Sequence, residues 1–292
     1  MAETFELLEK ALADGEEAIG ELFTFVTFCE ASIDLSPFTA KAPELAKDMT
    51  KRSGVTWGDG SLLRMERNAE AVKRGVSDLR GLTSYLHSLA YIRLCTALEV
   101  VVDTLLVSVL ADTDRWDQLP MVSGLKAGKV DVVSLLRSSA DQRVRFIAEE
   151  IKKGIGAPLK SGIGRFESVL DAVGMSGGVP TEVRDSILQL VEVRNAVVHR
   201  GGIADLRLVD KVPGLGFKEG EAIHISKIEF AIVSTASIWY ILELRRRANA
   251  IFPGAKNPHE AGFSEKIPED LKGYIAARGN SSRKMEDDVV PQ

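Results

Sequence analysis

An arginine, an amide and a histidine lie close together just before two consecutive glycines, in the stretch Val193–Gly202. Asn195 and His199 are four residues apart and therefore share a face of a helix, while Arg194 lies beside that face. Histidine moves protons near neutral pH, and arginine binds phosphate oxygens and the charge that develops on them. Since RNA supplies its own nucleophile, the 2′-hydroxyl, these side chains suit RNA cleavage without a metal, a cofactor or a serine.

The spacing leaves two arrangements open. Arg194 and His199 would point about 140° apart on a regular helix, too far to grip one phosphate. Either the helix end unwinds at its two glycines, or two copies of the helix end meet across a two-fold axis and share arginine and histidine. A structural role is the alternative, because a histidine in the last turn of a helix also stabilises its dipole. The same loose pattern recurs at Arg80 and His87, which would lie about 10 Å apart along a helix, without the accompanying asparagine.

Two helices are expected to position this site. The helix Thr181–His199 carries Arg194 in the middle of its apolar stripe, so the guanidinium needs an acidic partner. A second helical stretch, between Arg93 and Asp112, is apolar nearly all round and contains Glu99 and Asp103 one turn apart. Glu99 is therefore predicted to pair with Arg194, with Asp103 as a further supporting acid. The other interpretation is that both acids face a wet groove and have no function.

The rest of the chain also favours helices. Apolar spacing predicts a helix over residues 3–33 that Ser36-Pro37 ends, a second over 43–51, and a turn-rich junction at 53–60. Helical patterns follow from residue 62 to 111, and at 131–137, 141–153, 165–173, 181–199 and 226–247. Segments 206–209 and 222–225 could pair as a small β-hairpin.

The predicted fold class is therefore all-α, a helical bundle with a small β-hairpin near 206–225 and an N-terminal helical extension. The expected domains are the extension over residues 1–60, the bundle over 61–255, and a polar tail over 256–292 that is disordered apart from a turn around Asp270–Ala276.

Composition limits the functional classes. The 292 residues are 45% hydrophobic and 27% charged, which is typical of a globular protein, and the net charge of −5 argues against coating nucleic acid by bulk electrostatics. A local phosphate site is still compatible with the basic segment Lys126–Arg165. Its members Lys152, Lys153, Lys160 and Arg165, with Arg200, are candidate contacts to RNA phosphates. The loop Gly154–Ser161 matches the P-loop motif except that Leu159 stands where glycine is required. This difference excludes an NTPase of that type.

Cysteine content and hydropathy suggest a reducing environment. Cys29 and Cys95 are too few for a disulfide framework or a thiolate metal site, and no metal is expected. The longest apolar run, Leu94–Ala111, is interrupted by its two acids, and no secretory signal precedes it. We therefore expect a cytoplasmic protein without membrane insertion.

The segment Arg194–Asp205 resembles the signature of the HEPN superfamily, especially its prokaryotic branches associated with RNA-targeting toxins and phage defence. The resemblance covers residues 62–252 and implies a helical bundle, often dimeric, with metal-independent endoribonuclease activity in many members. It implies catalytic roles for Arg194, Asn195 and His199, supported by Glu99. One branch has a tyrosine two residues after the histidine as the target of nucleotide transfer. Gly201 stands there, so that modification is not expected.

Two functions follow from the resemblance. One is a homodimeric endoribonuclease, a toxin or anti-phage effector that acts on RNA and is controlled by an antitoxin or another defence-system protein. The other is a non-catalytic HEPN module that binds RNA, a nucleotide or a protein partner, and whose arginine and histidine hold a dimer together.

Overall fold

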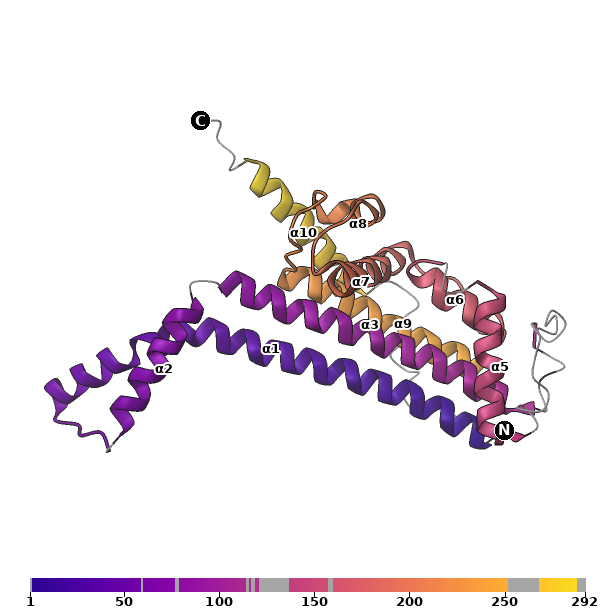
Figure 1. Ribbon diagram of the computed structural model, residues 1–292, viewed down its shortest axis with the longest axis horizontal. Coiled ribbons are helices and arrows are strands. Elements are labelled where there is room, and N and C mark those ends of the chain that lie inside the picture. Colours follow the sequence, from indigo (N-terminus) through magenta and orange to yellow (C-terminus); the bar gives the residue numbers. More distant parts are fainter. Residues whose placement is uncertain are drawn as a thin grey trace.

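The computed structural model describes residues 2–58, 60–76, 79–113, 116, 119–120, 137–156, 160–251 and 268–287. Within these ranges the chain is helical, as predicted, and the β pairing is confined to one antiparallel bridge between Ile203 and Ala222. The helices pack as an elongated bundle with a projecting helical hairpin (Figure 1). They are α1 (Ala2–Ser53), α2 (Ser61–Val76), α3 (Leu79–Ala111), α5 (Ala140–Gly154), α6 (Ile163–Asp171), α7 (Thr181–Arg200), α8 (Leu206–Lys211), the 3₁₀ turn η3 (Pro213–Leu215), α9 (Lys227–Ile251) and α10 (Glu269–Asp287).

Helix α3 is the centre of the bundle. It packs against α1, α5, α6, α7 and α9, and its residues Leu94, Leu98 and Leu105 are fully buried. The segment Thr83–Ala111 is long and apolar enough to cross a membrane by length and composition. However, 61% of its most apolar stretch is buried inside the bundle. A helix that is apolar nearly all round is typical of a core position. Burial among the neighbouring helices therefore explains why α3 is so apolar.

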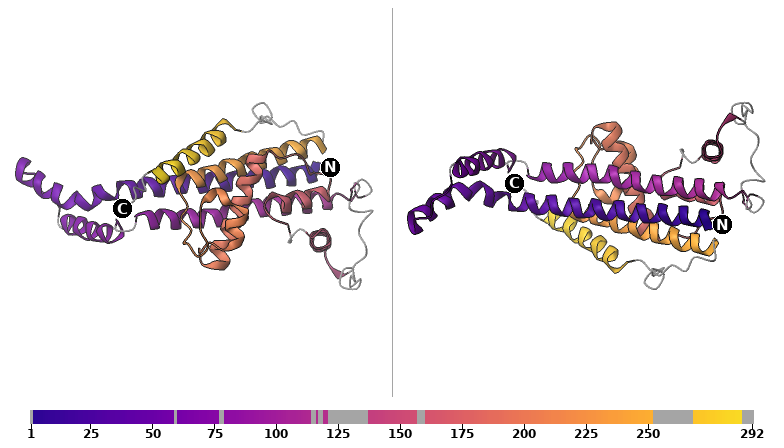
Figure 2. Two further views of the ribbon diagram at one scale, coloured as in Figure 1. Left: turned by 90° about the horizontal axis from the view of Figure 1, so that it is seen from above. Right: turned by 90° about the horizontal axis from the view of Figure 1, so that it is seen from below.

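Helix α1 is continuous, and the predicted end at Ser36-Pro37 is wrong. A proline inside a helix removes one hydrogen bond and costs about 3 kcal/mol. Packing on both sides of the proline offsets this cost, because α1 contacts α3 and α9 before Pro37 and α2 after it. Buried Leu12, Ile19 and Val26 place the first half in the main core. The second half projects with α2 as a helical hairpin (Figures 1 and 2).

The predicted β-hairpin is also wrong, since residues 206–209 belong to α8. Asp205 caps this helix, because its side chain accepts a hydrogen bond from the Leu208 amide at 2.9 Å. Strand-like pairing occurs slightly earlier in the chain. The Ala204 amide donates to the Glu221 carbonyl and the Ile223 amide to the Gly202 carbonyl, both at 2.8 Å. These bonds tie the turn after α7 to the segment before α9.

Part of the tail predicted to be disordered forms a helix, α10, which packs on α9. Leu271 is fully buried, and Arg278 Nη1 donates to Gln189 Oε1 of α7 at 2.9 Å. A few apolar positions at helical spacing are enough to dock a helix when a core face is already present. Residues 256–267 and 288–292 lie outside the described residues, as does the helix predicted at 131–137 except for Arg137.

A buried ionic network connects α6, the loop before α7 and α9. Arg247 Nε donates to Glu243 Oε1 at 2.8 Å, and its Nη1 lies 2.9 Å from Glu167 Oε1. Burial favours the neutral form of Glu243, but hydrogen bonds from Arg246 and Arg247 outweigh it and hold the pKa of this carboxyl below its usual range. Glu243 therefore binds the two arginines as a carboxylate at neutral pH.

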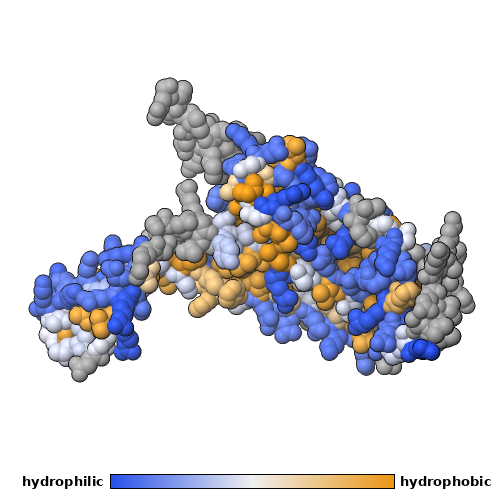
Figure 3. All heavy atoms as spheres, viewed as in Figure 1, coloured by the Kyte–Doolittle hydropathy of each residue, from blue (hydrophilic) through white to orange (hydrophobic). Residues whose placement is uncertain are grey.

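The face seen in Figure 3 is mostly polar, with apolar atoms gathered between α3 and α8.

Candidate functional site

Helix α7 ends as the two glycines predict. Gly201 and Gly202 adopt left-handed conformations with φ of 64° and 78°, and both amides donate to the Ala196 carbonyl. Only glycine adopts this conformation readily, so the pair stops the helix sharply. The helix stays regular through Arg200, and His199 therefore lies in its last turn, exposed to solvent.

The ion pair expected between Arg194 and Glu99 is present. Arg194 Nη2 lies 3.5 Å from Glu99 Oε2, and Arg194 Nη1 donates to Asn195 Oδ1 at 3.1 Å. Arg165 of α6 is the closer partner of the carboxylate, with Nη1 at 2.9 Å from Glu99 Oε1. Glu99 therefore holds two arginines from two helices side by side. The Arg194 Nε is buried and has no hydrogen-bond partner within the described part of the chain.

A pocket of about 290 Å³ opens at the C-terminal end of α7. It brings together five residues that the sequence had singled out, which are Lys160, Arg165, Asn195, His199 and Arg200. Its other lining residues are Val191, Glu192, Ala196, Asp205 and Arg207. The basic groups outnumber the two carboxylates, so the pocket favours an anionic ligand. The Arg194 side chain is not among its lining residues, because it is directed toward Glu99 on α3.

Sequence patterns do not single out Arg207 and Lys211, which contact Glu192, a buried acid of α7. Arg207 Nε lies 2.7 Å from Glu192 Oε2, and Lys211 Nζ lies 3.0 Å from Glu192 Oε1. The hydrogen bond from Arg207 to Glu192 raises the pKa of the guanidinium further above its already high value. These contacts fix α8 beside the pocket. The signal that could have revealed them is Asp205, because an aspartate at this position is a typical N-cap and predicts a helix where a strand was expected.

Three of the candidate residues lie elsewhere. Lys152 Nζ is 3.2 Å from Asp103 Oδ2, and Lys153 Nζ is 2.9 Å from Glu150 Oε1. Asp103 thus connects α5 to α3, and among the described residues its ion pair is with Lys152 and not with Arg194. Arg200 does reach the pocket, where its Nε lies 3.4 Å from Asp205 Oδ2.

The second arginine–histidine pattern forms a different environment. His87 is fully buried, with Nδ1 at 2.8 Å from the Ile225 carbonyl and Nε2 at 2.7 Å from Glu30 Oε1. Its ring stacks on Phe230 with a centroid distance of 5.4 Å. Both ring nitrogens have hydrogen-bond partners, so His87 connects α1, α3 and the segment before α9. A substrate cannot reach this buried side chain.

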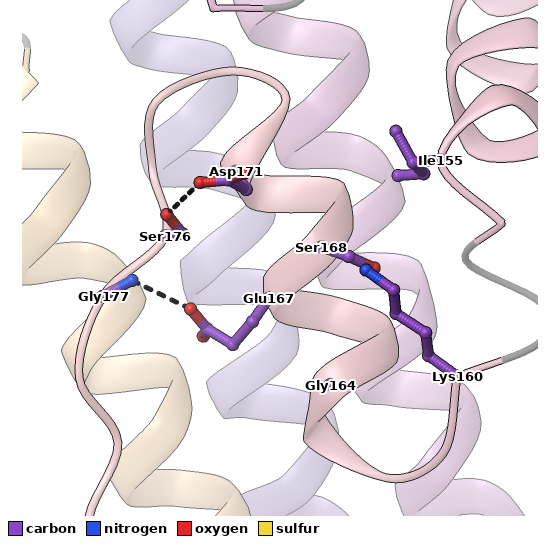
Figure 4. A pocket seen from close by; sticks show the side chains of 8 residues that line it. All are labelled: Ile155, Lys160, Gly164, Glu167, Ser168, Asp171, Ser176 and Gly177. Carbon is purple, nitrogen blue, oxygen red and sulfur yellow. Dashed lines mark hydrogen bonds between the residues drawn. The ribbon is translucent and has the colours of Figure 1, made fainter.

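A larger pocket, of about 450 Å³, lies on the other side of α6 and has a different character (Figure 4). Glu167 and Asp171 line it, and they accept hydrogen bonds from the Gly177 amide at 2.9 Å and from Ser176 Oγ at 2.7 Å. Lys160 lies across the pocket beside Ser168 and also lines the first pocket. The carboxylates make this pocket a poor site for a phosphate, which leaves the pocket at His199 as the better candidate.

Comparison with protein-family models, with curated proteins and with solved structures finds no match to this chain. The functional argument therefore depends on the residues and geometry of the site itself.

Proposed function

We propose that this protein is a metal-independent endoribonuclease of the HEPN type that acts as a homodimer in toxin or anti-phage defence, under the control of a partner protein. The observation that carries this proposal is an exposed imidazole, His199, at a pocket lined by basic side chains. These side chains belong to Lys160, Arg165, Arg200 and Arg207. A proton-transfer group beside several phosphate-binding cations is the arrangement that phosphodiester cleavage requires.

In the proposed reaction the 2′-hydroxyl oxygen of RNA attacks the adjacent phosphorus, and the bond from phosphorus to the 5′-oxygen breaks. His199 either takes the proton of the attacking hydroxyl or gives one to the leaving oxygen, and solvent water takes part in the other transfer, so that no net proton is gained or lost. Asn195, four residues earlier on the same face, orients the imidazole or the phosphate. Arginine neutralises the charge on the non-bridging oxygens. The products are a 2′,3′-cyclic phosphate and a 5′-hydroxyl.

The regular geometry of α7 favours the two-fold arrangement over unwinding of the helix end. Since α7 remains helical through Arg200, Arg194 and His199 diverge within one protomer. Val198, Ile203 and Leu206 are exposed apolar side chains around the same helix end. Such residues support a contact between two copies of this end, in which the arginine of one protomer works beside the histidine of the other.

One observation favours the alternative function. The Arg194 guanidinium is already engaged by Glu99 and by Asn195 within its own protomer. An arginine held in this way serves equally well in a non-catalytic HEPN module that binds RNA, a nucleotide or a protein partner.

Incubation of the purified protein with total and structured RNA in the presence of a chelator separates the two functions. We expect cleavage of RNA and no cleavage of DNA of the same sequence, and loss of cleavage in Arg194→Ala. Binding of RNA without cleavage under every condition would support the non-catalytic module. Cleavage that persists in both Arg194→Ala and His199→Ala would show that another site, or a contaminating nuclease, is responsible.

Replacing Glu99 with glutamine should lower the cleavage rate about tenfold, equivalent to about 1.4 kcal/mol of transition-state stabilisation. Glutamine keeps the size of the side chain but removes the charge that holds Arg165 and Arg194 in place. Single-turnover cleavage assays measure the effect. Asp103→Asn is the matched control, because Asp103 lies one turn away on α3 and pairs with Lys152 instead. Equal effects of the two substitutions would remove Glu99 from its positioning role.

A further inference from the structure

The helical hairpin at one end of the molecule has an uncovered face. We call residues 28–53 of α1 together with α2 the arm (Figures 1 and 2). Helix α2 packs on one face of α1, where Ala46 and Ala69 are buried. A neighbouring face of α1, beside the one that Ala46 occupies, carries large apolar side chains that remain exposed to solvent. Apolar atoms are visible on the surface where the arm leaves the bundle (Figure 3).

These exposed residues follow a heptad pattern. Seven positions of α1 alternate in steps of three and four residues, and we call them the arm seam. They are Phe28, Ala31, Leu35, Phe38, Ala42, Leu45 and Met49. Phe28 is 70% exposed and Phe38 is 68% exposed, and even Met49, the least exposed of the five large ones, is 48% exposed. A repeat of three and four residues keeps one stripe facing a neighbouring helix in a coiled coil, and α2 does not occupy that place.

We propose that a second copy of this chain binds along the arm seam, so that the two α1 helices form a short antiparallel coiled coil. The seam extends over three heptads, which matches a helix of the same length and pattern. Pairing would remove five large apolar side chains of each protomer from water. That corresponds to roughly 1,000 Å² for the two protomers together, at the lower limit of specific interfaces.

Apolar and small residues pair in layers in the antiparallel register. Leu35 lies opposite the partner's Phe38, Phe28 opposite the partner's Leu45, and Ala31 opposite the partner's Ala42. The small alanine layers let the helices approach closely, and the large layers on either side fill the interface.

Charge complementarity selects the antiparallel orientation. In that register Asp34 flanks the seam opposite the partner's Lys41, and the two-fold axis repeats this pair. Parallel pairing would place Asp34 near the partner's Thr39 and give no such ion pair. Asp34 Oδ2 also lies 3.1 Å from Lys227 Nζ of its own chain, so the partner's lysine would share a carboxylate that is already directed outward.

The arm seam is separate from the end of α7, where the proposed function already places a two-fold contact, so the seam is a second interface between copies and goes beyond the proposed function. No seam residue lines the pocket at that helix end. Assembly through the arm and cleavage of RNA can therefore be tested independently.

The double variant Leu35→Glu/Phe38→Glu tests the interface in the full-length protein. Four glutamates at the centre of the paired seam repel one another, so we expect the molar mass measured by light scattering to fall to half that of the wild type. Both side chains are exposed, and circular dichroism should be unchanged. The control is Val55→Glu/Leu63→Glu, which alters two exposed apolar residues outside the seam, one in the turn between α1 and α2 and one on α2, and should keep the wild-type mass. A wild-type monomer, or an unchanged mass in the seam variant, would overturn the proposal.

Disulfide cross-linking tests the register. In a background of Cys29→Ser/Cys95→Ala, the double variant Ala31→Cys/Ala42→Cys should oxidise to a covalent dimer, whereas each single variant should not. The two introduced thiols cannot pair within a chain, because eleven residues of helix separate them by about 16 Å. A covalent dimer formed by Ala31→Cys alone would indicate parallel pairing and overturn the antiparallel coiled coil.

Discussion

Replacing His199 with alanine is expected to lower the rate of RNA cleavage by a factor of about 10²–10⁴, the usual contribution of a general acid or base. His199 is exposed on the last turn of α7, and its imidazole lines the pocket that holds Lys160, Arg165 and Arg200. The substitution removes the proton-transfer group and leaves these cations in place. Single-turnover cleavage at saturating protein concentration measures the chemical step, and a filter-binding assay should show little change in RNA affinity.

The matched control is His224→Ala. His224 is also an exposed histidine, but it lies before α9 and does not line the pocket. Its removal should leave the cleavage rate unchanged. A wild-type rate in His199→Ala would exclude His199 from proton transfer and would favour the non-catalytic module.

Replacing Arg247 with alanine should lower the free energy of unfolding by about 3–5 kcal/mol, the typical cost of removing one partner from a buried ion pair. Arg247 is only 6% exposed, and it donates to Glu243, to Glu167 and to the carbonyls of Met175 and Gly178. Its removal takes from Glu167 the arginine that pairs with it and leaves the buried Glu243 with Arg246 alone. Urea denaturation at neutral pH, followed by circular dichroism, measures the change.

Arg246→Ala provides the control for this stability effect. Arg246 is the preceding residue and also binds Glu243, with both hydrogen bonds at 2.8 Å, but its side chain is 42% exposed. Water screens an exposed pair, so the substitution should cost about 1 kcal/mol or less. Similar losses in the two variants would mean that burial of the Arg247 network is not the source of its stabilisation.

The parts of the structure that follow from the sequence are those with strong local signals. The apolar pattern of α3 and the glycines at 201 and 202 predicted a core helix and the end of α7. Burial arguments then predicted the pair of Arg194 with Glu99, because each charge in an apolar stripe needs a partner.

The parts that do not follow depend on contacts between distant segments. The continuity of α1 through Pro37 results from packing against α2, α3 and α9, which no local propensity encodes. Docking onto a finished core likewise stabilises α10. The pocket needs α6 and α8 to meet α7, so Arg207 and the double role of Arg165 became visible only in three dimensions.

End-group analysis of a DNA oligonucleotide with a single ribonucleotide, incubated with the protein in chelator, tests the proposed chemistry most directly. We expect one cut, after the ribonucleotide, that leaves a 2′,3′-cyclic phosphate and a 5′-hydroxyl, and no cut when the 2′-hydroxyl is methylated. This result would follow from attack by the 2′-hydroxyl with proton transfer by His199. Cleavage of the methylated substrate, or a 3′-hydroxyl instead of a cyclic phosphate at the cleavage site, would contradict the proposed endoribonuclease.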